Sequence, residues 1–307
     1  MEHTINDVMI GRCKNGDLLY HYTSVDGIMG IIINKTLWAT SYQFLNDYSE
    51  IAYSREIVKE FCAGLVKNKE SAAKFYDDIS KEMSVIFNET FVSEDKFSGV
   101  YISSFSLNHD SPLLWAEFND FKGYIIEIKF EDLAKSFIDG NDFVSHGKVV
   151  YDIEEQKDCL KKELDAINKE IGFDLEKTAY IEDDGMREKY AEIIRRFGKS
   201  CVVLSMFFKK KCFEQEHEYR IVCTPGLIKE EDGNKMLNKH LKFRTMNNWI
   251  VPYYEIVAKK VDKVLIESIT VGPLNNRELA KTGLSVFLRA NNYDIEIKES
   301  NIPIRYK

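Results

Sequence analysis

The stretch Gly123-Tyr124-Ile125-Ile126-Glu127-Ile128-Lys129-Phe130 decides the fold class of this chain. Apolar residues dominate it and alternate with charged residues toward its end, which is typical of a strand with a buried face. Shorter apolar runs bounded by turn-forming residues recur on both sides and predict further strands. We expect these at residues 18–22, 36–40, 100–106, 144–151, 218–223, 264–271 and 293–298.

Two charged segments with helical periodicity separate these strands. In residues 48–92, apolar side chains from Ile51 to Leu65 recur at the spacing of one buried helix face. Residues 152–200 contain the helical patterns KKELDAINKE and REKYAEIIRRF. Shorter helices are expected at residues 25–33, 113–115 and 274–290, and irregular structure at 224–254.

The chain shows no internal repeat and no low-complexity segment, and it contains only five prolines. No Pro/Gly/Ser linker divides it, so we expect a single α+β domain over residues 1–307. The helices at about 48–92 and 152–200 are then elaborations of that domain.

The composition is that of an ordinary globular protein, with 44% hydrophobic and 30% charged residues. The net charge of -8 argues against a broadly basic nucleic-acid-binding surface. Residues 1–7 lack the basic and apolar regions of a secretory signal, and the apolar run at 28–33 is too short to span a bilayer. We therefore expect a cytoplasmic protein without a membrane partner.

The six cysteines form no C-x-x-C pair, which fits reduced thiols in a cytosol. Cys212, His217 and Cys223 allow a zinc site as an alternative, but structural zinc normally needs four ligands at tighter spacings. Small, partly buried core thiols are the simpler interpretation, and no metal is expected.

The first of two polar motifs at strand ends is Tyr20-His21-Tyr22-Thr23-Ser24. His21 and Thr23 are two residues apart, so they share one face of a strand and could face one cleft. His21 could donate a hydrogen bond to a ribose hydroxyl, and Ser24 could cap the helix that follows. A hydrogen-bonded histidine without a ligand is the alternative.

The second motif is Glu214-Gln215-Glu216-His217-Glu218-Tyr219-Arg220, in which Glu216 and Glu218 are also two residues apart. A carboxylate beside a ribose can stabilise the oxocarbenium-like state that forms when a glycosidic bond breaks, and a second carboxylate can deprotonate an acceptor. The alternative is a solvated acidic edge, or ion pairs with Arg220 and the lysines at 209–211.

Other polar and aromatic residues could complete such a site. Ser104 and Ser106 lie at a strand end and could bind a ribose or orient a glutamate, although turn-forming serines are the simpler interpretation. Trp38 and Tyr42 could stack on nicotinamide or adenine, or belong to the core. The basic and aromatic stretch 207–213 could hold a nucleic-acid acceptor, or form a solvated helix end.

Several common catalytic motifs are missing from the sequence. It contains no P-loop, no Gly-rich dinucleotide fingerprint, no H-E-x-x-H and no G-x-S-x-G. These absences argue against a phosphotransferase, a Rossmann-type dehydrogenase, a zinc protease and an α/β-hydrolase.

The chain resembles the microbial family catalogued as domain of unknown function 2971. The matching stretches follow the family's order and span nearly the whole chain. They are Tyr20-His21-Tyr22-Thr23-Ser24, Leu37-Trp38-Ala39-Thr40, Leu45-Asn46-Asp47 with Glu50, Ser104-Phe105-Ser106, Leu114-Trp115, Gly123-Tyr124, Glu216-His217-Glu218-Tyr219-Arg220, Ile269-Thr270-Val271-Gly272-Pro273 and Ser300-Asn301-Ile302-Pro303-Ile304-Arg305.

The order of these motifs is similar to that of ADP-ribosyltransferases, which use nicotinamide adenine dinucleotide (NAD) as co-substrate. The resemblance implies an α+β fold with a split antiparallel β-sheet and additional helices. It also implies an intracellular effector, in phage defence or as a toxin module, that transfers ADP-ribose to a protein, RNA or DNA and has an antitoxin or defence-system partner. By this analogy Glu218 is the catalytic glutamate and Glu216 the first carboxylate of the pair. The cofactor-binding residues would be His21, Tyr22, Thr23, Trp38, Tyr42, Ser104, Ser106 and Arg220.

Two other functions fit the same residues. A non-enzymatic sensor could use the cleft to bind a nucleotide or a phage component without turnover. A nuclease could use Glu216, Glu218 and Asp47 around a magnesium ion, because clustered carboxylates suit that metal.

Overall fold

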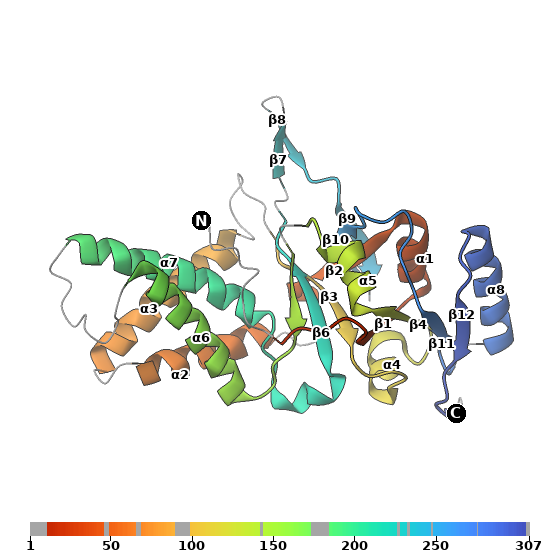
Figure 1. Ribbon diagram of the computed structural model, residues 1–307, viewed down its shortest axis with the longest axis horizontal. Helices are drawn as coiled ribbons and strands as arrows, with labels where there is room; N and C mark the ends of the chain where they lie inside the picture. Colours follow the sequence, from red (N-terminus) through yellow and green to blue (C-terminus); the bar gives the residue numbers. More distant parts are fainter. Residues whose placement is uncertain are drawn as a thin grey trace.

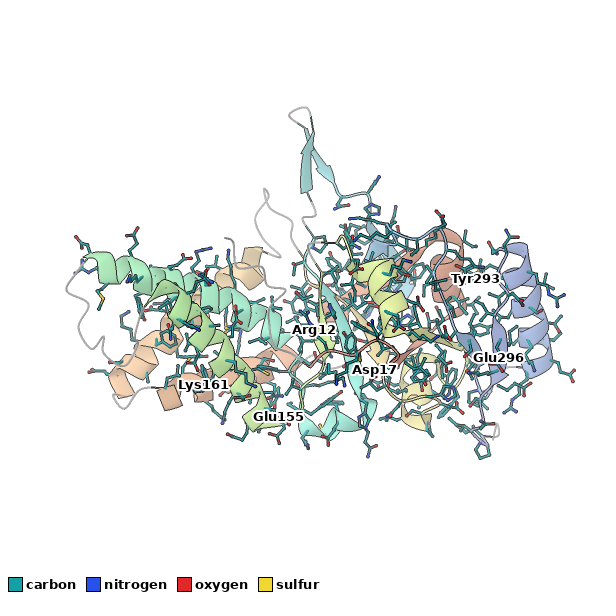
Figure 2. All side chains as sticks on the ribbon, in the orientation of Figure 1. Arg12, Asp17, Glu155, Lys161, Tyr293 and Glu296 are labelled. Atoms are coloured by element: carbon teal, nitrogen blue, oxygen red, sulfur yellow. The ribbon has the colours of Figure 1, made fainter. Side chains whose placement is uncertain are left out.

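This protein has a mixed α/β fold with a mostly antiparallel sheet, as the strand pattern predicts. Figure 1 shows the sheet in the middle, a group of long helices at one end and helix α8 at the other. Glu155 and Lys161 project from α6 at the helical end, whereas Tyr293 and Glu296 lie beside α8 (Figure 2). The computed structural model describes residues 11–45, 49–65, 69–89, 99–141, 144–172, 184–225, 228–231, 234–246, 248–274 and 276–304.

Within those residues the main sheet has ten strands, in the order β12-β11-β4-β1-β3-β2-β10-β9, with β6 on the other edge of β3 and β5 on β6. Only the β11–β12 pair is parallel. Strands β7 (Ile228–Glu231) and β8 (Asn234–Leu237) form a separate hairpin. The strands of the main sheet are β1 (Leu18–Thr23), β2 (Thr36–Ser41), β3 (Tyr101–Ser106), β4 (Tyr124–Lys129), β5 (Val144–Lys148), β6 (Glu218–Cys223), β9 (Leu241–Met246), β10 (Trp249–Val257), β11 (Ser268–Val271) and β12 (Glu296–Glu299).

Strand β3 is the branch point of the sheet. One edge pairs with β6 along its whole length, ending where Ser106 lies opposite Glu218. The other edge is shared, because β1 pairs with β3 at Ser106 whereas β2 pairs with it at Tyr101 and Ile102. Strands β1 and β2 therefore diverge beside the middle of β3, and we call this place the fork.

The long helices occupy the two charged segments and form one layer, which we call the helical layer. Their buried faces meet in a hydrophobic cluster that includes Ile102 of β3 and Val222 of β6, so the layer and the sheet share a core. Burial of apolar area at this junction is what holds the layer in place. The helices are α2 (Glu50–Leu65), α3 (Lys69–Glu89), α6 (Ile153–Ile171) and α7 (Asp184–Ser205).

A second large cluster lies on the opposite face of the sheet, because neighbouring residues of β3 and β6 alternate between the two clusters, and it includes buried residues of α1 and α8 such as Ile31 and Leu288. Ser24 caps α1 as expected, because its side chain accepts the Gly27 N–H at 3.2 Å. None of the described helices combines the length and apolar character needed to cross a membrane. The remaining helical elements are α1 (Val25–Asn34), η2 (Tyr42–Phe44), α4 (Pro112–Asn119), α5 (Phe130–Leu133), η3 (Ala134–Ile138), η4 (Lys211–Glu216) and α8 (Arg277–Ala290).

The structure differs from the sequence pattern mainly between residues 224 and 254. We expected irregular structure there, but the stretch contains β7, β8, β9 and most of β10. Strand β9 lies at the edge of the sheet, and most of its side chains are exposed or half-buried. An edge strand needs no continuous apolar run, so its sequence carries little periodic signal. The expected strand at 144–151 also ends early, at Lys148.

All six cysteines are free thiols, as expected for a protein without disulfides. Four of them, including Cys201 and Cys223, are buried. Cys212 is exposed.

Phe197 offers a test of whether the helical layer and the sheet unfold together. Its fully buried ring contacts Phe61 at 6.0 Å and Phe75 at 6.2 Å between centroids, so it joins α2, α3 and α7. We expect Phe197→Ala to lower the free energy of unfolding by about 3–5 kcal/mol. The exposed Val85→Ala in α3 is the control and should cost less than about 1 kcal/mol.

Tryptophan fluorescence is the measurement for this test, because Trp38, Trp115 and Trp249 lie outside the helical layer. A shift of the tryptophan-detected urea midpoint in Phe197→Ala would show one cooperative unit. An unchanged midpoint, with helix loss seen only by circular dichroism, would contradict the single domain.

Candidate functional site

A pocket lies where the ends of β1, β3 and β6 approach helix α4. Aromatic rings, hydroxyls and carboxylates form its walls. It holds about 270 Å³ of empty space, counting the part open to solvent. The lining residues are Tyr20, Tyr22, Ser104, Phe105, Ser106, Leu114, Phe118, Glu216 and Glu218.

Strand alternation decides which residues of the first motif line this pocket. Tyr20 lies in register with Ser106 across the β1–β3 pair, and side chains in register emerge on the same face. Tyr22 is two residues further on and shares that face. His21 and Thr23 point the other way and do not line the pocket. The predicted strand is therefore part of the site, but through its two tyrosines.

Glu218 is the first residue of β6 and its carboxylate is held by cations. Arg220 Nε donates to Oε1 at 2.8 Å, and Lys209 Nζ lies 3.4 Å from Oε2. Burial by itself would raise the pKa of Glu218, but the charges of Arg220 and Lys209 and a hydrogen bond with Ser104 lower it to about 2. The carboxylate is therefore ionised throughout the physiological pH range.

Glu216 reaches the same pocket from a different element than expected. It ends η4, and His217 has a left-handed backbone with φ 42°, so the two glutamates do not share a strand. Its carboxylate accepts a hydrogen bond from Lys209 Nζ. Burial raises the pKa of Glu216, Lys209 opposes the rise and Glu218 adds to it, and the result is a pKa of about 7. Glu216 therefore exchanges its proton near neutral pH.

Arg220, which we predicted to bind the cofactor, uses its guanidinium for hydrogen bonds and ion pairs with other residues of the protein. It is 1% exposed, and Nη1 and Nη2 each donate to one oxygen of Glu50 at 2.8 Å. Nη1 also donates to the carbonyl of Met206 at 2.6 Å. Because Glu50 begins α2, this bidentate pair joins the helical layer to the sheet. Arg220 is not among the pocket-lining residues.

Hydrogen bonds from the loop after β3 fix the pocket walls. Ser106 Oγ donates to the carbonyl of Glu216 at 2.7 Å and accepts the Asn108 N–H at 2.9 Å. The Tyr22 hydroxyl accepts the Ser111 N–H at 2.8 Å and donates to the Asn108 carbonyl at 3.3 Å. These bonds hold η4 and Tyr22 in position around the empty space.

The other predicted residues lie outside the pocket. At the fork, His21 Nδ1 donates to the carbonyl of Ser104 at 2.9 Å. Thr23 is buried at the end of β1, and Trp38 lies on β2 on the far side of the fork. Tyr42 begins η2 and packs against the hydrophobic cluster of the helical layer. The structure thus brings Tyr22, Ser104, Ser106, Glu216 and Glu218 together at the pocket. The four residues that lie outside the pocket are His21, Thr23, Trp38 and Tyr42.

Sequence reasoning gave no role to Tyr20 and Glu50. Both stood inside matching stretches, but nothing in their spacing indicated a wall residue or an ion-pair partner. Ion pairs of the glutamates with Arg220 and the lysines at 209–211 were the alternative interpretation of the second motif, and the structure shows them for Arg220 and Lys209. Of the three lysines, Lys209 alone is buried. Its position directly after the apolar pair Phe207–Phe208 is the one local signal that could have distinguished it.

Metal ligation finds no support in the part of the chain that the structure describes. Within it, no three His, Cys, Asp or Glu side chains are grouped so that they could hold a metal ion. Asp47, which we considered for a nuclease, lies outside the described residues.

The paired glutamates give the pocket two distinct chemical groups. One carboxylate stays charged, and the other can accept or release a proton at neutral pH. Carboxyl groups whose pKa values are held apart in this way can divide the roles of charge stabiliser and acid or base. The aromatic walls can hold a flat ring beside them.

Comparison with known proteins confirms the resemblance to the family. Residues 114–221 match the family described as "Protein of unknown function (DUF2971)". The matched segment includes α4, the helices α6 and α7, and the residues Glu216, Glu218 and Arg220. No curated protein and no solved structure matches the chain significantly.

The raised pKa of Glu216 makes stability depend on pH. The folded state holds the Glu216 proton more tightly than the unfolded state, so unfolding becomes easier as pH rises from about 4.5 to about 7. For this group the loss is roughly 3 kcal/mol, and Glu216→Gln should remove it. Urea unfolding at pH 5 and pH 8 measures the difference, with the exposed Glu214→Gln as control. Equal pH dependence in wild type and Glu216→Gln would rule out the raised pKa.

Proposed function

We propose that this protein, whose residues 114–221 match a family of unknown function, transfers ADP-ribose from NAD to a macromolecular acceptor. The observation that carries the proposal is the pair of buried glutamates in one aromatic pocket, with pKa values of about 2 and about 7. Glycosyl transfer needs these two functions, a fixed negative charge and a proton acceptor, side by side.

The proposed reaction begins at the bond between the nicotinamide nitrogen and C1′ of its ribose. When this bond breaks, its electron pair leaves with nicotinamide, and positive charge develops at C1′. The ionised Glu218 carboxylate stabilises that charge, and Arg220 and Lys209 keep the carboxylate in place. Tyr20 and Tyr22 form the wall against which the nicotinamide ring packs.

The acceptor then supplies the new bond. A hydroxyl or amine of the acceptor donates a lone pair to C1′, and its proton passes to the carboxylate of Glu216. A pKa of about 7 suits this step, because a general base works best when its pKa is near the working pH. Labelling of separate protein, RNA and DNA pools from labelled NAD distinguishes the three classes of acceptor.

In this proposal only one end of the dinucleotide enters the pocket. The nicotinamide end lies against the two tyrosines and the rest of NAD extends beyond the pocket, because the roughly 270 Å³ of empty space already includes the part open to solvent. The resemblance supports a cytoplasmic effector in phage defence or a toxin module, restrained by an antitoxin or defence-system partner.

Labelled NAD tests this function. We expect wild-type protein, given adenine-labelled NAD and separate protein, RNA and DNA pools, to label one pool. Glu218→Gln removes the stabilising charge, so it should label that pool at least about 100-fold more slowly than wild type does. The exposed Glu214→Gln is the matched control and should label it at the wild-type rate. Saturable binding of NAD without release of nicotinamide in any pool would instead identify a sensor, and nucleic-acid loss that needs magnesium but not NAD would identify a nuclease.

The pH dependence of the same reaction tests the role of Glu216. Because the base must be ionised, the rate should rise with pH and level off above about pH 7. Glu216→Gln should be slow and lack this rise, while retaining NAD binding. A wild-type rate that stays flat between pH 5.5 and 8.5 would remove Glu216 from the proton transfer.

A further inference from the structure

Arg244 is a partly buried arginine without an anionic partner among the residues that the structure describes. It lies on β9, and Nη2 donates to Thr40 Oγ1 of β2 at 2.8 Å. Among the described residues this is its only hydrogen bond, and the enclosed Nε has none. No carboxylate within the described part of the chain forms an ion pair with it.

Comparison with Arg220 makes the difference clear. Both arginines lie on strands of one sheet, but Arg220 contacts the carboxylates of Glu50 and Glu218, whereas Arg244 contacts none. An arginine cannot avoid this situation by losing its proton. A charge removed from water without a partner is costly, and a bound anion can supply that partner.

Two aromatic rings compensate the charge only in part. The Arg244 guanidinium lies 5.9 Å from the ring centre of Trp38 and 5.8 Å from that of Tyr253. Such cation–π contacts are favourable, but aromatic ring faces do not satisfy all the N–H donors of a guanidinium. Glu255 lies opposite Trp38 in the β2–β10 pair, but this carboxylate interacts with the charge of Lys242 and not with Arg244.

The position of Arg244 connects it to the pocket through the fork. Arg244 donates to Thr40 of β2, whereas His21 of β1 donates to the Ser104 carbonyl, so these two side chains belong to the two strands that diverge at the fork. Burial lowers the pKa of His21, the hydrogen bond to Ser104 opposes this, and the charge of Arg244 adds a smaller lowering. Ser104 links the fork to the pocket, since its carbonyl accepts from His21 and Ser104 also lines the pocket.

We infer that Arg244 and the fork bind the diphosphate of the dinucleotide whose nicotinamide end occupies the pocket. A guanidinium presents parallel donors that match the oxygens of a phosphate group. Thr40, to which Arg244 donates, lies opposite Ile102 of β3, whereas Glu218 lies opposite Ser106, four residues further along β3 and on its other edge. Two interstrand spacings of about 4.8 Å and four residues of about 3.3 Å each place Glu218 on the order of 15 Å from this end of Arg244, and an extended dinucleotide can bridge this gap. The identity of the ligand rests on the proposed function, whereas the anion site itself does not.

Calorimetric titration of ADP-ribose, inorganic diphosphate and nicotinamide tests the inference. Arg244→Met should bind ADP-ribose at least about 10-fold more weakly than wild type and lose inorganic diphosphate, while nicotinamide binding changes less than about twofold. Arg244→Lys keeps the charge without the parallel donors and should be intermediate. The surface variant Arg195→Met in α7 is the matched control and should bind all probes as wild type does.

Stability of the free protein guards against misfolding as an explanation. Removing an unpaired, partly buried charge should leave the melting temperature of Arg244→Met equal to or above that of wild type. ADP-ribose should raise the melting temperature of wild type more than that of Arg244→Met.

Three results would overturn the inference. These are absence of ADP-ribose binding by wild type, equal binding by wild type and Arg244→Met, or an Arg244 requirement for a short oligonucleotide but not for ADP-ribose. The proposed function fails separately, if wild type binds ADP-ribose through Arg244 but neither transfers label from NAD nor releases nicotinamide.

Discussion

The bidentate ion pair between Arg220 and Glu50 is the interaction on which the rest of this structure depends. It joins the first residue of α2 to the interior of the sheet, with both side chains buried. Buried charges are tolerated only when each has its partners. The helical layer, the connection that carries Lys209 and strand β6 must therefore adopt one relative arrangement, and that arrangement also places Glu218 in the pocket.

The surroundings of the two carboxylates explain why two neighbouring glutamates behave differently. Burial by itself raises the pKa of both. For Glu218, the charges of Arg220 and Lys209 outweigh burial, and the pKa falls to about 2. For Glu216, burial is the largest effect, Lys209 opposes it only in part and Glu218 adds to it, so the pKa rises to about 7. The difference that suits the pair to acid–base chemistry follows from the position of Arg220, which pairs with Glu218.

The fork in the sheet supplies the second organising constraint. Strands β1 and β2 compete for one edge of β3, so each pairs with only part of it. The Ser104 carbonyl at this gap accepts its hydrogen bond from the side chain of His21 and not from the backbone of a neighbouring strand. On the other side of the gap, Arg244 donates to Thr40 of β2 and lies over the ring of Trp38. Polar groups therefore gather at the fork because the backbone there lacks its regular partner.

The sequence by itself determined most of the elements of this protein, although not β7, β8, β9 and β10, and it determined the strands that carry its site. Alternation and helical periodicity are local, so they predicted β4, the helical layer and the segments around Tyr22, Ser104 and Glu218. Tertiary structure alone decided that Tyr20 faces the pocket, that Glu50 pairs with Arg220, and that Lys209 is the buried lysine. It also decided that Arg244 has no carboxylate partner within the described part of the chain. The reason is physical: strand register, burial and charge pairing depend on residues far apart in the chain, and no local pattern records which of them meet.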